Sequence, residues 1–156
     1  MPEWAYELGL LGNLLLKHKL QEGEHVSSAL LNGEHIACYY KERGFAYIVL
    51  PILAKKQYTL TFTIGTSDMP TYVLNDGTYN VGEFQSDADN ALVGLEMYGT
   101  QQVKVKLLFE PHEVTSTNTD LDIKEWRYEA PFINMRIHGQ NIQGETGMVS
   151  IRSKPL

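Results

Sequence analysis

The stretch "QYTLTFTIGTSDMPTYVLNDGTYNVG", residues 57–82, decides the fold class of this chain. In its first part, apolar side chains alternate with polar ones, which places Tyr58, Leu60, Phe62 and Ile64 on one face and Gln57, Thr59, Thr61 and Thr63 on the other. Successive side chains of a β-strand point to opposite faces, so this period of two predicts a half-buried strand. Threonine suits the solvated face because its β-branch fits a pleated surface and its hydroxyl stays hydrated.

Further along the same stretch, Asn75-Asp76-Gly77 separates "TYVL" from "TYNVG". Asp-Gly and Asn-Gly dipeptides supply the positive φ angles that tight hairpin turns require, so these residues predict a β-hairpin.

Strand signals continue outward on both sides of this stretch. They lie in "FAYIVLPI", "ALVGLEMYG", "QQVKVKLLFEP", "KEWRYEA", "FINMRIHG" and "GMVSIRS". The polar run "PHEVTSTNTDLD" between them predicts the longest loop. One face is expected to carry Val103, Val105, Leu107 and Phe109, and another Ile133, Met135 and Ile137. Roughly nine to eleven short strands punctuated by turns predict an all-β fold, an antiparallel β-sandwich of the jelly-roll type, over residues 25–156.

The first 24 residues allow two interpretations. Trp4 together with Leu8, Leu11, Leu14 and Leu15 could form a short, partly helical extension that docks on a partner. Alternatively, "NLLLKHKL" is the first strand of the sandwich.

The composition of the chain disfavours several classes of function. The chain has 156 residues, a formal net charge of -6 and a pI near 5.3, which disfavours a nucleic-acid binder because that role needs clustered Lys and Arg. No apolar run reaches the roughly 18 residues of a membrane span. The acidic start predicts no conventional secretory signal. The single cysteine, Cys38 in "HIACYYK", is expected to be a small buried hydrophobe.

No motif in the sequence predicts catalysis or a cofactor. The chain has no Gly-x-Ser-x-Gly, no phosphate-binding glycine loop and no His-Glu-x-x-His, and its five histidines are scattered. Asp87-Ala88-Asp89-Asn90 is similar to the start of a calcium loop but lacks the glycine and the distal glutamate, so a solvated turn is expected. We therefore predict no catalytic residue, no metal and no cofactor.

The aromatic residues suggest ligand binding. A flat ring can stack on the apolar face of a sugar, whereas in a β-sandwich such rings also pack the core. Seven rings lie near strand ends or on polar faces: Tyr39, Tyr40, Tyr72, Tyr79, Tyr98, Trp126 and Tyr128. Tyr72, Tyr79 and Trp126 are the candidate ligand-binding residues because each adjoins a predicted turn or loop.

The sequence resembles the jelly-roll carbohydrate-binding modules of families 4 and 9, including related sandwiches of bacteriophage tail and fibre proteins. The resemblance is carried by "GNLLLK", by "LPILAKKQYTLTFTI" and by the final pair "EAPFINMRIHGQ" and "GETGMVSIRS". It implies a β-sandwich without catalysis that binds glycans or builds assemblies. The last strand of those modules often carries an acidic residue for a structural calcium, but here "VSIRS" has Arg152, so no calcium is expected.

Two functional hypotheses follow from the sequence. The first is a non-enzymatic structural or adhesion protein of a virion, expected to be that of a bacteriophage, whose partners are other virion proteins or copies of itself. The alternative is a stand-alone module, cytoplasmic or extracellular, that recognises a polysaccharide through exposed aromatic residues.

Overall fold

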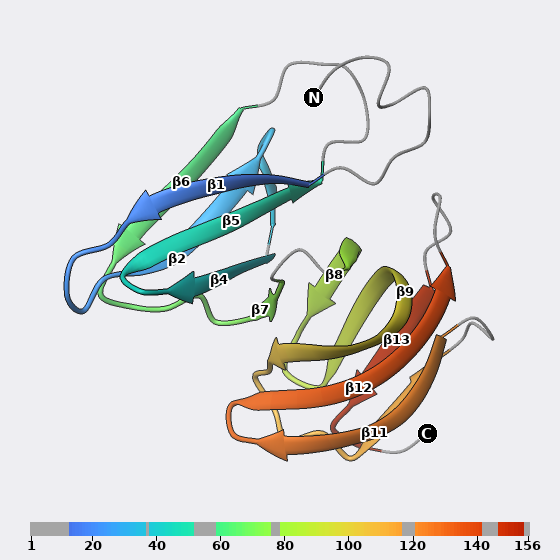
Figure 1. The fold of residues 1–156 in the computed structure, drawn as a ribbon. Helices are drawn as coiled ribbons and strands as arrows, with labels where there is room; N and C mark the ends of the chain where they lie inside the picture. The colour runs from blue at the N-terminus through green and yellow to red at the C-terminus, as the bar shows by residue number, and fades with distance from the viewer. Residues whose placement is uncertain are drawn as a thin grey trace, which may run out of the picture.

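The computed structural model describes residues 13–36, 38–51, 59–75, 79–116, 121–141 and 147–154, and these form an all-β structure (Figure 1). The described residues contain no helix, hence none long and apolar enough to cross a membrane. The sheets stay open and stack as a β-sandwich, so the predicted fold class is confirmed. The strands are β1 (Asn13–Lys19), β2 (His25–Leu31), β3 (Glu34–His35), β4 (Cys38–Glu42), β5 (Phe45–Pro51), β6 (Leu60–Gly65), β7 (Tyr72–Leu74), β8 (Asn80–Ser86), β9 (Asn90–Lys106), β10 (Glu113–Ser116), β11 (Leu121–Glu129), β12 (Phe132–Asn141) and β13 (Gly147–Arg152).

One long sheet runs through the whole described structure. This main sheet has the order β1-β5-β4-β7-β9-β12-β11, and its pairs are antiparallel except that of β4 with β7. A first cover sheet, β3-β2-β6, belongs to the N-terminal half. A second cover sheet consists of β8, the first half of β9, β13 and β10. Figure 1 shows the two halves with β7 between them.

The described residues form two hydrophobic cores. The N-terminal core contains Val26, Ala46 and Ile48, and the C-terminal core contains Val93 and Ile133 together with many residues of β9, β12 and β13. Each core is enclosed between the main sheet and one of the cover sheets.

Strand β7 contributes to both cores. Val73 lies in the C-terminal core, whereas Tyr72 is buried in the N-terminal core and Leu74 packs against it. Adjacent side chains of a strand point to opposite faces. The two cores therefore lie on opposite faces of the main sheet at β7.

Strand β9 forms the corner between two sheets. The sequence predicted two strands here, but the structure has one strand of 17 residues that passes through Gly99. Gly99 has a φ of 87°, a left-handed conformation that glycine adopts without steric cost. The first half of β9 pairs with β8 and β13, and the second half pairs with β7 and β12. Both halves contribute to the C-terminal core.

The predicted hairpin around Asn75 is wrong. Strands β7 and β8 do not pair with each other; Val73 of β7 pairs with Val105, and Phe84 of β8 pairs with Val93. Because β9 offers partners in two different sheets, β7 lies in the main sheet and β8 in the second cover sheet. Residues 76–78 of the expected turn lie outside the described residues.

Other strand predictions are confirmed. In β6 the side chains of Thr61 and Thr63 are exposed, while Phe62 and Ile64 pack against the N-terminal core. The trio on β12, Ile133, Met135 and Ile137, is fully buried.

The predicted long loop contains a strand. Residues 113–116 form β10, which pairs with β13 and places Val114 against the C-terminal core. The local sequence of such a polar four-residue strand carries no strand signal, because the strand forms only by pairing with β13. At the other end of the chain, "NLLLKHK" forms β1, paired with β5 at the edge of the main sheet.

Gly139 lies where β12 crosses the corner of β9. It pairs with Gly99 and is buried, and a Cβ built at this position would meet the Met97 side chain and lie 2.9 Å from Leu121 Cδ2. Real Cβ atoms do not approach neighbours this closely. The space for a side chain is therefore already filled by the core.

We predict that Gly139→Ala lowers the free energy of unfolding by about 1–3 kcal/mol, because the extra methyl group overpacks the C-terminal core. Gly65→Ala is the matched control, since its Cβ would lie 3.7 Å from Ser27 Oγ, an ordinary contact. Urea unfolding of the three proteins measures the difference. Equal midpoints for Gly139→Ala and the wild type would contradict the packing described for this corner.

Candidate functional site

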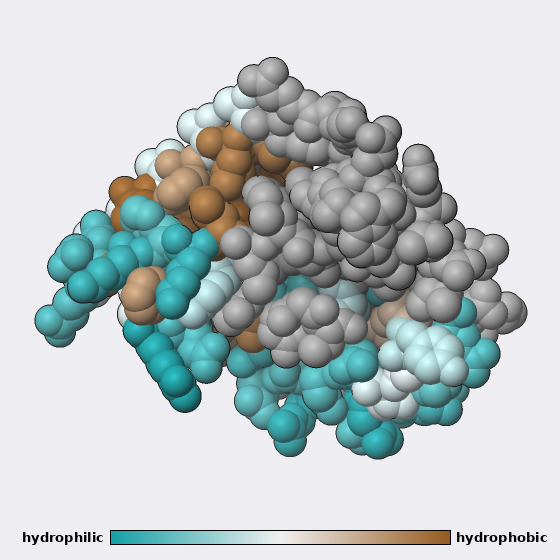
Figure 2. Space-filling view, turned by 45° about the horizontal axis from the view of Figure 1, so that its top comes forward, coloured by the Kyte–Doolittle hydropathy of each residue, from teal (hydrophilic) through white to brown (hydrophobic). Residues whose placement is uncertain are grey.

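The main sheet presents a polar face on β9, β12 and β11, opposite the C-terminal core. Because paired residues point to the same side of a sheet, the register defines this outer face row by row. The rows are Lys106–Phe132–Glu129, Lys104–Asn134–Arg127, Gln102–Arg136–Glu125, Thr100–His138–Asp122 and Tyr98–Gln140. In Figure 2 hydrophilic residues cover the lower part of the view, while hydrophobic residues gather over the N-terminal half.

A shallow groove crosses this outer face. It encloses about 330 Å³ and is lined by Gln102, Glu125, Trp126, Arg127, Asn134 and Arg136. Within the outer face, Arg136 Nε lies 3.5 Å from Glu125 Oε1, and Arg127 Nε lies 2.9 Å from Glu129 Oε1. Farther along, Thr100 Oγ1 lies 2.9 Å from His138 Nδ1. The groove therefore presents amide and guanidinium donors and a carboxylate acceptor on rigid strands, which is what recognition of a polar ligand requires.

The three predicted aromatic candidates do not come together. Trp126 lines the groove from the edge strand β11 and is 38% exposed, although its register partner is Met135, which lies on the core side of the sheet. Tyr72 is 7% exposed in the N-terminal core, and Tyr79 is 4% exposed in the C-terminal core, where its hydroxyl donates to the Leu74 carbonyl oxygen. In this structure Tyr72 and Tyr79 pack the interior, and only Trp126 presents a surface to a ligand.

One exposed ring was not among those three candidates. Tyr98, at the corner of β9, is 71% exposed and pairs with Gln140 at the end of the outer face. The alternation of Asn134, Arg136 and His138 with buried Ile133, Met135 and Ile137 is the sequence signal that could have revealed the polar face beside it.

Of the predicted docking residues, Trp4, Leu8 and Leu11 lie outside the described residues. Leu14 and Leu15 belong to β1, where they pair with Leu50 and Val49.

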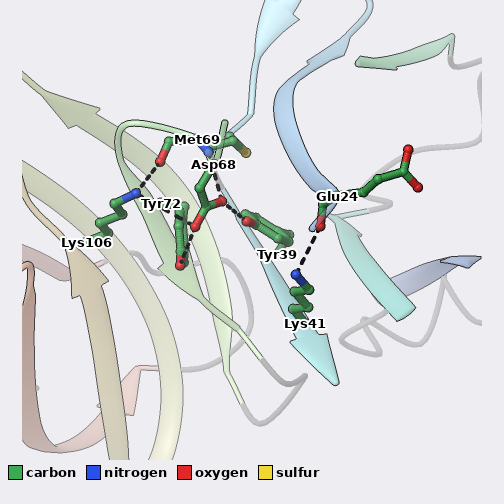
Figure 3. A network of polar contacts seen from close by, with 7 residues as sticks. All are labelled: Glu24, Tyr39, Lys41, Asp68, Met69, Tyr72 and Lys106. Carbon is green, nitrogen blue, oxygen red and sulfur yellow. Dashed lines mark hydrogen bonds and ion pairs between the residues drawn. The ribbon is translucent and has the colours of Figure 1, made fainter. Parts of the chain in front are cut away.

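A polar network joins the two halves of the main sheet (Figure 3). Asp68, between β6 and β7, accepts hydrogen bonds from the hydroxyls of Tyr39 and Tyr72, the latter at 3.3 Å, and from the Met69 N–H at 2.8 Å. Lys106 Nζ lies 3.7 Å from Asp68 Oδ2 and donates to the Met69 carbonyl oxygen at 2.9 Å. We call these five residues the junction network, since they come from β4, β7, β9 and the connection before β7.

The chemistry of the junction network is structural. Burial is the main cause that raises the pKa of the Tyr39 and Tyr72 hydroxyls, and their hydrogen bonds and proximity to the Asp68 carboxylate raise it further. Both phenols therefore stay protonated at neutral pH and donate to Asp68. A protonated phenol that donates to a carboxylate is not an activated nucleophile.

The thiol of Cys38 is held in its protonated form. Burial raises the pKa of its thiol to about 12, although a hydrogen bond with the Asn75 side chain lowers it somewhat. The Cys38 residue is half-buried and belongs to neither core, so the predicted role as a small buried hydrophobe is not confirmed. Because the thiolate is the reactive form, the raised pKa makes this thiol a weak nucleophile.

The Asp87 turn connects β8 and β9 as a solvated turn, as predicted. Asp87 Oδ1 accepts the backbone N–H groups of Asp89 and Asn90, each at 2.8 Å, and these bonds lower the pKa of the Asp87 carboxyl. A second hollow of about 510 Å³ lies beside it, lined by Gln85, Ser86, Asp87, Asn90, Ala91, Leu92, Ser150 and Arg152. Across the described ranges, no three His, Cys, Asp or Glu side chains are grouped to hold a metal ion.

Comparisons with protein-family models, with curated proteins and with solved structures find no match to this chain. Its function is therefore inferred from the outer face, the groove and the junction network themselves.

We predict that Tyr39→Phe lowers the free energy of unfolding by about 1–3 kcal/mol, because Asp68 loses a hydrogen bond in a part-buried site. Tyr98→Phe removes the same hydroxyl from an exposed ring and serves as the control, with no expected change. Chemical unfolding measures both variants. A Tyr39→Phe protein as stable as the wild type would show that the junction network does not hold the halves together.

Proposed function

We propose that this chain is a non-enzymatic structural or adhesion protein of a virion, expected to be that of a bacteriophage. The observation that carries the proposal is the continuity of the main sheet through both cores. Because β7 packs into both and the junction network ties them, a load applied at one half passes to the other through hydrogen-bonded strands. Such a body suits a building block, and the resemblance to tail and fibre sandwiches supports the same role.

The composition of the two hollows supports the non-enzymatic part of the proposal. Among the described residues, each hollow is lined by a single carboxylate, Glu125 in one and Asp87 in the other. Glycoside hydrolysis, the common chemistry on sugars, uses a pair of carboxylates on either side of the scissile bond.

The proposal predicts assembly through the N-terminal segment. We expect the full chain to self-associate at high concentration or to bind another virion protein, with Leu8 and Leu11 in the contact. Sedimentation or light scattering of the wild type and of the Leu8→Ser/Leu11→Ser variant measures the self-association. A wild type that stays strictly monomeric, and whose mass the double substitution leaves unchanged, would count against the proposal.

The outer face favours a second candidate function, the binding of a glycan. The groove of about 330 Å³ falls in the range of small-ligand sites, and amide, guanidinium and carboxylate groups are those that bond sugar hydroxyls. Trp126, at the edge of the groove, and Tyr98, at the end of the outer face, supply rings on which a sugar can stack.

We expect Trp126→Ala to weaken polysaccharide binding roughly tenfold, because a stacked ring is worth about 1 kcal/mol or more. Tyr98→Ala should weaken it less. Phe45→Ala, on β5 in the other half of the main sheet, is the control and should bind like the wild type. Isothermal titration against a polysaccharide panel tests this; binding that survives both substitutions, or no binding at all, would exclude the outer face as a glycan site.

A further inference from the structure

Three cationic side chains surround Asn134 on the outer face. Lys104 and Arg127 are its cross-strand partners on β9 and β11, and Arg136 lies two residues farther along β12 on the same face. Neighbouring strands are about 4.8 Å apart and alternate residues about 6.6 Å apart, so all three long side chains can reach a group seated over Asn134. The groove passes this point, lined by Arg127, Asn134 and Arg136.

The charges around Asn134 do not cancel. Arg136 is paired with Glu125 and Arg127 with Glu129, so three cations face two carboxylates. Among the described residues Lys104 has no carboxylate within ion-pair distance; its Nζ lies 4.6 Å from the centroid of the Phe132 ring. On a chain of net charge -6, this cluster is a local positive site.

The two arginine pairs leave binding capacity for a ligand. Each pair is made through Nε, and a guanidinium carries five N–H donors, so further donors are available to an incoming anion. Both pairs are solvent-exposed, and exposed ion pairs contribute little to stability. An anionic ligand can therefore bind these arginines beside their carboxylate partners, or replace one partner, with little loss of folding stability.

From this arrangement we infer that the outer face binds a glycan that carries anionic groups, carboxylate or sulfate, with one such group at Asn134 between Lys104, Arg127 and Arg136. This inference rests on the proposed glycan-binding function. The Asn134 amide donates to the anion, and Trp126 and Gln102 contact the neutral part of the sugar unit.

The net charge of the chain limits the class of ligand. A nucleic-acid backbone is held by many phosphate contacts, and one cluster of three cations on an acidic protein supplies few. An acidic polysaccharide has its charges on widely spaced sugar units, and repulsion from distant acidic residues is screened beyond about 8 Å at physiological ionic strength. A single cluster is therefore sufficient to hold one charged unit.

The test is calorimetric titration of the full chain with a polyuronate, a sulfated polysaccharide and a neutral β-glucan. We expect at least one acidic polymer to bind roughly tenfold or more tightly than the neutral one, and added salt to weaken it. Lys104→Gln, at a residue that does not line the groove, should weaken acidic binding roughly 5- to 20-fold and leave any neutral binding unchanged. Arg136→Gln should weaken acidic binding by a similar factor. Lys19→Gln, an exposed lysine on β1, removes the same charge from the other half and should change neither affinity.

The outcomes separate this inference from the function on which it rests. A neutral polymer that binds as tightly as both acidic ones, with Trp126→Ala abolishing it, overturns the anionic preference but leaves glycan binding intact. Acidic binding that Lys19→Gln lowers as much as Lys104→Gln overturns the site, because the attraction is then unspecific. No binding to any polymer overturns both proposals. The two acidic polymers distinguish carboxylate from sulfate recognition.

Discussion

The alternation of side chains along three residues of β7 is the constraint on which the rest of this structure depends. Val73 points into one core, and Tyr72 and Leu74 point toward the other, so two cores form on opposite faces of one continuous sheet. A slip of one residue would exchange these directions and place a tyrosine where a small valine packs. The junction network reinforces this register, because Tyr72 bonds Asp68 and lies 4.7 Å, centroid to centroid, from Tyr39 on the neighbouring strand.

The same constraint explains where the candidate site lies. The second cover sheet packs on the face of β9, β12 and β11 that carries Ile133, Met135 and Ile137, and so the opposite face of these strands lies outside the C-terminal core. The first cover sheet packs on this opposite face, but over the N-terminal half. The result is a polar surface on β9, β12 and β11, and the alternate side chains of these strands are anchored in the C-terminal core on the reverse side. Groups positioned in this way lose little freedom when a ligand binds.

The predictions from sequence succeeded where local alternation decides the structure and failed where distant pairing decides it. The faces of β6 and β12 follow from a period of two within the strand itself, and both were predicted correctly. The turn at Asn75 has the local signal of a hairpin, yet the long strand β9 offers better partners to β7 and β8 in two different sheets. The burial of Tyr72 and Tyr79 depends on that same pairing, and so does the exposure of Tyr98 at the corner of β9.

The junction network also determines which charge is available at the outer face. Lys104 and Lys106 occupy alternate positions of β9 and point to the same side. Lys106 is held by Asp68 and the Met69 carbonyl oxygen at the border of the N-terminal core, and its charge is neutralised there. Phe132 packs against that core, and Lys104, one row farther along, has its Nζ 4.6 Å from the centroid of the same ring. The boundary of the N-terminal core thus separates a lysine that stabilises the fold from a lysine that can meet a ligand.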